Sequence, residues 1–237
     1  MGRLAQTLGV MKSTTAMLDD FFAAVPLHLH KRSGKVFYTG RMAFSRRSTL
    51  YVLGLNPGGD PETNSDETIG AHSQQVIHSL PEMWSAYRDE SWEGAKPGTW
   101  QMQPRVLHMF RSLGVNPASV PCSNLVFART KDEASLNAEL PILMPACWPF
   151  HRAVLAYHRP RVILCFGQTA GDLVRLQLNA HELIGQFIEN NSRRWKSSAY
   201  RAPDGIKVVV ATHPSRVKWQ EPATDPSSLI ASALHDA

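Results

Sequence analysis

Two polar segments that interrupt apolar runs carry the residues best suited to chemistry. Asn56, Pro57 and Gly58 follow one run, and His213 follows another about 150 residues later. Proline fixes φ and glycine admits dihedral angles closed to other residues, so the first segment can hold an amide rigidly beside backbone N–H groups. An ordinary turn is the alternative for the same three residues, because Asn-Pro-Gly is also a favourable turn sequence.

The second segment continues from His213 into Pro214 and Ser215. A histidine at the end of a strand can donate a hydrogen bond to developing negative charge. The Ser215 hydroxyl and nearby backbone amides could hold a phosphate group. A surface or core histidine without a catalytic role is the alternative for His213.

A third polar residue, Asn124, lies inside the strand-like run from 120 to 127. A buried amide without partners costs about 1 to 3 kcal/mol, so its side chain needs a ligand or a backbone partner. Asn offers one acceptor and one donor side by side, which matches the O4 and N3–H edge of uracil. Hydrogen bonding to neighbouring backbone remains an equal alternative.

Four apolar runs predict the strands that position these residues, namely 50–55, 120–127, 162–166 and 208–211. Near-continuous apolar runs are typical of strands covered on both faces, as in parallel sheets. Helical spacing is present at 72–80, 103–113 and 148–157, a strand-to-helix turn at Gly167, and a hairpin or exposed loop at 190–203. We therefore expect a three-layer α/β/α fold around a central, mainly parallel four-stranded sheet, with the strand ends opening onto one crevice.

The 237 residues, 43% of them hydrophobic, fit one domain spanning 1–237. No apolar stretch is long enough for a membrane span, and no secretion signal is visible. We expect a soluble monomer, cytoplasmic if the protein is bacterial. Arg3 and Lys12 precede the first acidic residues, which leaves an organellar transit peptide as an alternative.

The net charge of +5 is unevenly distributed, since residues 1–50 hold eight Lys or Arg against two acids and residues 51–100 hold two against eight. A basic face of this kind is compatible with a polyanion partner and equally with a merely solvated surface. Cys122, Cys147 and Cys165 show no metal-binding spacing. We expect them to be buried small hydrophobes, and we expect neither a metal nor another cofactor.

Taken in order, these elements resemble the uracil-DNA glycosylase superfamily. The resemblance rests on Gly54 to Gly58 as the first motif, Asn124 as a base-reading amide, the strand and turn from 162 to 167, and His213 to Ser215 as the second motif. An Asn-Pro-Gly motif paired with His-Pro-Ser is most similar to the SMUG, or single-strand-selective, branch. The resemblance covers about residues 35–220.

The resemblance implies a monofunctional enzyme of DNA base excision repair that hydrolyses the N-glycosidic bond of a flipped-out uracil or related base in damaged DNA. Asn56 would position the attacking water and His213 would stabilise the leaving base. Residues implied to bind the substrate are Gly54, Leu55, Pro57, Gly58 and Asn124. Residues implied to bind DNA are Pro214, Ser215, Arg216 and Lys218, and Trp219 beside them either enters the duplex or is simply buried.

The sequence departs from the family where a stacking phenylalanine is usual, because Ile69 is the only large apolar residue in that segment. Either an aromatic such as Phe127 or Trp84 would then contact the base, together with Ile69, or stacking is weak and the substrate is not uracil. This departure and the acidic stretch after Gly58 favour a rival hypothesis, a catalytically silent nucleic-acid-binding protein with the same fold. An unrelated enzyme of nucleotides or phosphate esters is a third possibility, although no GxxxxGK[ST] motif is present.

Overall fold

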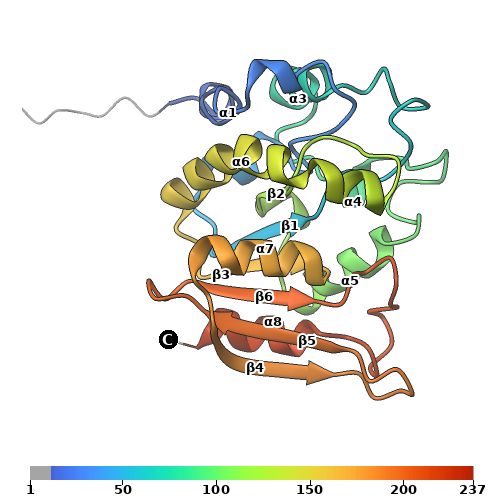
Figure 1. Ribbon diagram of the computed structural model, residues 1–237, viewed down its shortest axis with the longest axis vertical. Coiled ribbons are helices and arrows are strands. Elements are labelled where there is room, and N and C mark those ends of the chain that lie inside the picture. Colours follow the sequence, from blue (N-terminus) through green and yellow to red (C-terminus); the bar gives the residue numbers. More distant parts are fainter. Residues whose placement is uncertain (1–11, 237) are drawn as a thin grey trace, which may run out of the picture.

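The six strands of the protein form one mixed sheet, as seen in a computed structural model that describes residues 12–236 (Figure 1). The strand order is β2-β1-β3-β6-β5-β4, in which the first four strands are parallel and the last two are antiparallel. The strands are β1 (Leu50–Gly54), β2 (Cys122–Asn124), β3 (Val162–Phe166), β4 (Glu182–Ile188), β5 (Lys196–Arg201) and β6 (Lys207–Ala211).

The four predicted strands form the parallel part of the sheet, but the prediction of four strands in total was wrong. Two more strands, β4 and β5, extend the sheet beyond β6 as an antiparallel hairpin. Every residue of β1, β3 and β6 is buried, whereas β4 consists of exposed and half-buried residues only. The missed pair therefore lacked the continuous apolar run that marked the other strands. For the segment 190–203 the sequence left a hairpin or an exposed loop open, and the structure shows a hairpin.

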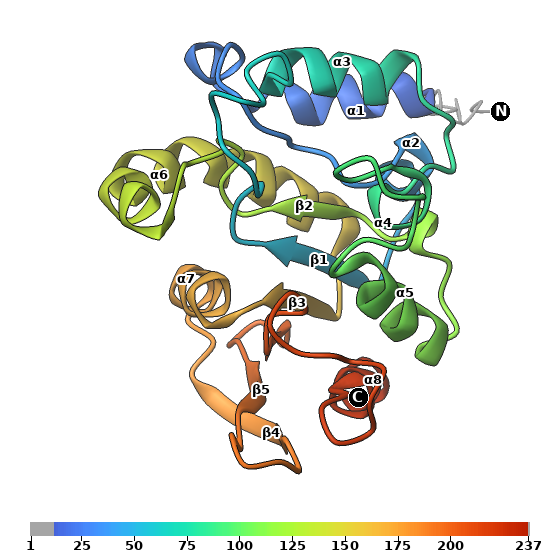
Figure 2. The same cartoon turned by 90° about the vertical axis from the view of Figure 1, so that its right-hand side faces the viewer.

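Helices cover both faces of the sheet, with α6 and α7 on one side and α5 and α8 on the other (Figure 2). Helices α1 and α3 lie beyond the β2 edge. The α-helices are α1 (Thr14–Phe22), α2 (Arg41–Ser45), α3 (Ile69–His78), α4 (Ala86–Asp89), α5 (Gln103–Ser112), α6 (Glu133–His158), α7 (Gln168–Leu178) and α8 (Ser227–His235). This arrangement gives the three layers expected from the sequence, with short 3₁₀ turns at Leu27–Leu29 and Pro117–Ser119.

The predicted helix at 148–157 is only the last part of α6, which begins fifteen residues earlier at Glu133. Its first half contains Pro141 and Pro145, and Pro149 follows in the next turn. Proline inside a helix removes a hydrogen bond and is normally a sign of a helix end. The spacing of four places all three prolines along one side of the helix, and α6 continues through them.

A hydrogen-bonded chain beneath the sheet joins α6 to β1 and to the end of β2. The Tyr51 hydroxyl lies 2.8 Å from His151 Nδ1, and His151 Nε2 lies 3.1 Å from the Leu125 carbonyl oxygen. A carbonyl only accepts, so Nε2 carries the proton and Nδ1 accepts from Tyr51. Burial lowers the pKa of His151 to about 4, which keeps the ring neutral.

All three cysteines are buried and unpaired, as the sequence predicted. Burial raises the pKa of Cys147 to about 11 and that of Cys122 and Cys165 further still, so these thiols stay protonated. Within residues 12–236, none of the helices combines the length and the apolar composition that crossing a bilayer requires. The part of the suggested transit peptide that precedes Lys12 lies outside the described residues.

We predict that Gly34→Ala destabilises the protein by at least about 2 kcal/mol more than Gly205→Ala, because a new methyl group would overlap a backbone atom. A Cβ at Gly34 would collide with the Phe127 carbonyl oxygen, whereas one at Gly205 would meet open space. Both glycines have positive φ, so the control carries a backbone strain of its own. Free energies of unfolding from denaturant titration would test this, and equal losses would contradict it.

The buried His151 also predicts acid sensitivity. Its pKa is depressed from 6.5 to about 4, so its contribution to stability is complete above pH 6.5 and is lost as the pH falls through about 4. The loss amounts to about 3 kcal/mol for this shift. The unfolding free energy of His151→Gln should therefore fall less steeply than that of the wild type between pH 6.5 and 4, and parallel profiles would argue against it.

Candidate functional site

The loops that follow β1 and β6 leave the sheet at the same edge. Gly54 at the end of β1 pairs with Asn124 of β2, and Phe166 at the end of β3 pairs with Ala211 of β6. Strand β3 separates the two loops, so β1 and β6 lie two strand spacings, or about 10 Å, apart. No hydrogen bond joins Asn56 to His213. Both loops therefore lie at the end of the sheet where the sequence predicted a crevice.

The amide of Asn56 is held by one hydrogen bond. Its Nδ2 donates to the Thr130 hydroxyl at 3.1 Å, while its Oδ1 has no hydrogen-bond donor among residues 12–236. The backbone carbonyls of Gly54 and Leu55 accept from the amides of residues 125 and 126, so the loop stays tied to the β2 segment up to Asn56. An oriented carbonyl oxygen without a protein partner can accept a hydrogen bond from water.

Asn124 is nearly buried at the end of β2, and its Nδ2 has no hydrogen-bond partner. A side chain at Gly54 would overlap Asn124 Oδ1, so glycine is required there. The phenol of Tyr38 lies close to the amide, and burial raises its pKa to about 12. Tyr38 therefore stays a neutral hydroxyl, and Asn124 retains an unused donor in a buried place.

His213 is half-buried and is held through Nδ1. The backbone N–H of Ser215 donates to Nδ1 at 3.1 Å, and the Ser215 hydroxyl lies 2.7 Å from the same atom. Since Nδ1 accepts, the proton of the neutral ring is on Nε2. Burial, together with the charge of Arg216, lowers the pKa of His213 to about 4. His213 is therefore a neutral donor near pH 7.

The loop after β3 packs against this histidine. Gly167 has a φ of +90°, and a Cβ there would lie 3.4 Å from His213 Cδ2. The ring of Phe166 meets His213 edge to face, with centroids 6.3 Å apart. Arg105 of α5 donates to the Pro214 carbonyl at 2.5 Å, which fixes the following turn.

The residues assigned to DNA contact lie in different environments. Pro214 is buried, whereas Ser215, Arg216 and Lys218 are exposed. Trp219 is fully buried against Phe166, with ring centroids 5.5 Å apart. It belongs to the core, which is the simpler of the two alternatives that the sequence left open.

The residues expected to contact a base beside Asn124 are also in the core. Ile69 and Phe127 are both 0% exposed, and Trp84 is 6% exposed. Phe127 packs edge to face on Phe150, at 5.2 Å between centroids. None of the three offers an open face for stacking in this arrangement. Asp60, considered as an assisting acid, instead accepts a hydrogen bond from the backbone of Glu62 in its own turn.

A buried ionic network beside Asn124 was not found from the sequence. Lys35 Nζ lies 2.8 Å from a Glu67 oxygen and 2.6 Å from a Glu90 oxygen. Arg129 donates to Glu67, to the Ser33 hydroxyl and to the Gly58 carbonyl, each at 2.6 Å. The signals were Lys35 directly before an apolar run and Arg129 directly after another, both of which predict a paired charge.

The pKa shifts of Lys35 and Glu67 favour the charged form of both groups. Burial alone would lower the pKa of Lys35, but Glu90 and Glu67 outweigh it and raise that pKa. Burial likewise opposes ionisation of Glu67, and Lys35 with Arg129 still lowers its pKa. Two cations therefore face two carboxylates, with no net charge.

Glu67, Glu90 and His72 could in principle ligate a metal, because their ligand atoms lie within 4.8 Å of one another. The ammonium of Lys35 already bonds to both carboxylates. Burial lowers the pKa of His72 to about 3, so it adds no charge. The donor set is thus neutralised by side chains of the protein itself and does not fit a divalent cation without displacing Lys35.

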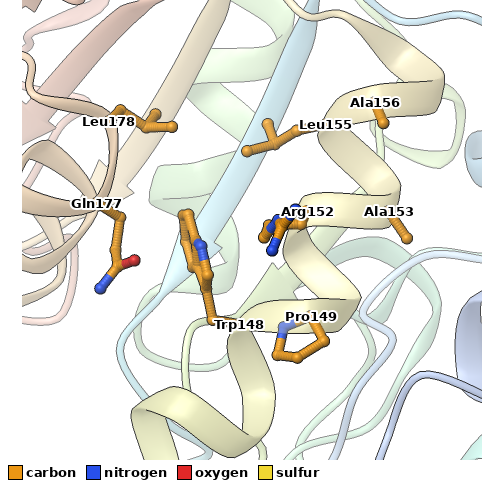
Figure 3. A pocket seen from close by; sticks show the side chains of 8 residues that line it. All are labelled: Trp148, Pro149, Arg152, Ala153, Leu155, Ala156, Gln177 and Leu178. Atoms are coloured by element: carbon orange, nitrogen blue, oxygen red, sulfur yellow. The ribbon is translucent and has the colours of Figure 1, made fainter.

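A surface hollow of about 540 Å³ lies elsewhere, between α6 and α7. Trp148 and Leu155 of α6 project toward Leu178 near the end of α7 (Figure 3). Helix α7 begins at the carboxyl ends of the strands, where the site lies, and runs away from them. The hollow is lined by the last residues of α7, so it lies toward the amino ends of the strands. It takes no part in the site described above.

Neither the models of known protein families nor the sequences of curated proteins give a match to this chain. The fold and the geometry define an α/β protein with an orphaned amide and a neutral histidine at one sheet edge.

We predict that Arg216→Ala raises the pKa of His213 above about 4, because the charge of Arg216 is one cause of its depression. Burial is the larger cause, so the pKa should stay below 6.5. An NMR titration of the imidazole would measure both changes. Lys218→Ala, two residues further on, is the matched control, and equal responses of the two variants would refute the assignment.

Proposed function

We propose that this protein is a DNA glycosylase that hydrolyses the N-glycosidic bond of a flipped-out uracil or related deaminated or oxidised base. The observation that carries the proposal is the buried Asn124 amide, whose Nδ2 has no partner. An unsatisfied buried donor costs about 1 to 3 kcal/mol, so a ligand that accepts a hydrogen bond from Nδ2 would remove this cost. The O4 atom of uracil is such an acceptor.

The neutral state of His213 supports the same chemistry. When the glycosidic bond breaks, negative charge develops on the departing base. A neutral imidazole that donates from Nε2 can stabilise this charge, and it needs no proton transfer to do so. The hydrogen bonds from Ser215 to Nδ1 keep Nε2 as the protonated atom.

Asn56 supplies the third function, the positioning of water. Its Nδ2 is engaged with Thr130, so Oδ1 is the atom left to orient a water molecule. An amide is too weak a base to take a proton from that water. Catalysis in this proposal therefore depends on stabilising the charge-separated transition state.

A second function is favoured by one specific observation, the complete burial of Ile69 and Phe127. Because neither the Phe127 ring nor the Ile69 side chain is free to stack on a base, the surface around Asn124 could bind nucleic acid without excising a base. In that case the protein would be a catalytically silent binder.

Base release from oligonucleotides tests the two functions. Single- and double-stranded oligonucleotides carrying uracil, hydroxymethyluracil, xanthine or hypoxanthine would be incubated with the protein and then treated with alkali to cleave abasic sites. Release of any of these bases supports the glycosylase. Binding of all of them without release would leave the silent binder as the function.

For an active protein, we predict that His213→Ala slows base release by about 10²- to 10³-fold, the usual effect of removing one donor to a developing anion. Asn56→Ala should slow the same step through loss of the positioned water. Asn124→Asp keeps the side-chain shape but replaces the Nδ2 donor by an acceptor, so it should also slow release of uracil. His181→Ala, at an exposed position before β4, is the control. Wild-type rates in all three site variants would refute the roles assigned to them.

A further inference from the structure

A basic hollow of about 410 Å³ lies beside the loop that carries Asn56. Its walls come from three distant segments of the chain: residues 31–33, residues 61 and 65, and residues 129–139. The polar groups that matter here are Lys31, Arg32, Arg129, Lys131, Ser65 and Ser135.

Two of the four cations in this hollow are already paired. Arg32 bonds to Glu139 at 2.6 Å, and Arg129 bonds to Glu67 at 2.6 Å. Lys31 and Lys131 are exposed, and no carboxylate lies within 4.0 Å of either ammonium among residues 12–236. The hollow therefore holds an excess of positive charge that the described part of the chain does not neutralise.

The hollow is joined directly to the candidate site. Thr130 in its wall accepts the hydrogen bond from Asn56 Nδ2, and Arg129 in the same wall donates to the Gly58 carbonyl. A group bound in the hollow would therefore lie next to the loop at which we place the hydrolysed bond. Arg129 itself is fixed by three hydrogen bonds, so this wall is rigid.

We propose that this hollow binds a backbone phosphate of the nucleic acid strand whose base enters the site. The proposal rests on the proposed function, in that a nucleic acid is the ligand. Two unpaired ammonium groups with the hydroxyls of Ser65 and Ser135 suit a phosphodiester, which has a single negative charge and oxygen acceptors. On the other flank of the crevice, Arg216 is exposed after His213. The strand is thus held on both sides of the flipped nucleotide.

The test is charge reversal at the two unpaired lysines. An undamaged fluorescein-labelled single-stranded oligonucleotide would be titrated with the wild type and with Lys31→Glu/Lys131→Glu, and binding followed by fluorescence anisotropy at several salt concentrations. We expect the double variant to bind at least about 10-fold more weakly at low salt, with the slope of log K against log salt reduced by about 1, as expected for the loss of one phosphate contact.

Lys96→Glu is the matched control, because Lys96 is an exposed lysine of the acidic segment after the first loop and lies outside the hollow. It should bind within about twofold of the wild type. An equal loss of binding in Lys96→Glu would show a general charge effect and would overturn the proposal. Unchanged binding in the double variant would overturn it as well.

Failure here and failure of the proposed enzyme are distinguishable. Base release by the wild type combined with unchanged binding by the double variant would refute the phosphate site alone. Weaker binding by the double variant without base release by the wild type would support the phosphate site and refute the glycosylase.

Discussion

A single guanidinium holds together the segments on which the site depends. Arg129 is only 5% exposed, and three of its nitrogens donate to Gly58, Ser33 and Glu67. A guanidinium does not lose its proton in a protein, so its burial is tolerated only where its donors find acceptors. The loop after β1, the extended segment along β2 and the approach to α3 are therefore confined to one mutual arrangement. Removing any one acceptor would leave part of a buried charge unsatisfied.

The same constraint explains why a charged network can lie next to an orphaned amide. Lys35 and Arg129 balance Glu67 and Glu90, so the region carries full charges without a strong net field on Asn124. Beneath the sheet, Tyr51 and His151 hold the Leu125 carbonyl, one residue beyond Asn124. The backbone that carries Asn124 is thereby fixed at Leu125, next to the charged network.

The sequence predicted the parts of the fold that depend on local pattern. Leu50 to Gly54 and Val162 to Phe166 are apolar throughout because both faces of the sheet are covered, and that signal was sufficient. Only the second half of helix α6 was predicted. Pro141 is locally a signal for a helix end, but the helix continues through it in the folded protein. Ile69 was placed near the base on its distance along the chain from Asn56, and distance along the chain carries no information about burial. Arg129 was missed because its partners are distant in sequence.

The parallel strand order has a consequence for how the chain is made. Strand β1 ends at residue 54, but its neighbours begin at residues 122 and 162, and β3 gains its second neighbour only at residue 207. During synthesis from the amino terminus, more than half of the chain must leave the ribosome before β1 is paired on both sides. Pairings between such distant segments also form slowly, because the entropy of loop closure is lost before the stabilising contacts form. The segments that carry Asn56 and Asn124 are therefore synthesised well before the segment that carries His213, which follows β6 in the last fifth of the sequence.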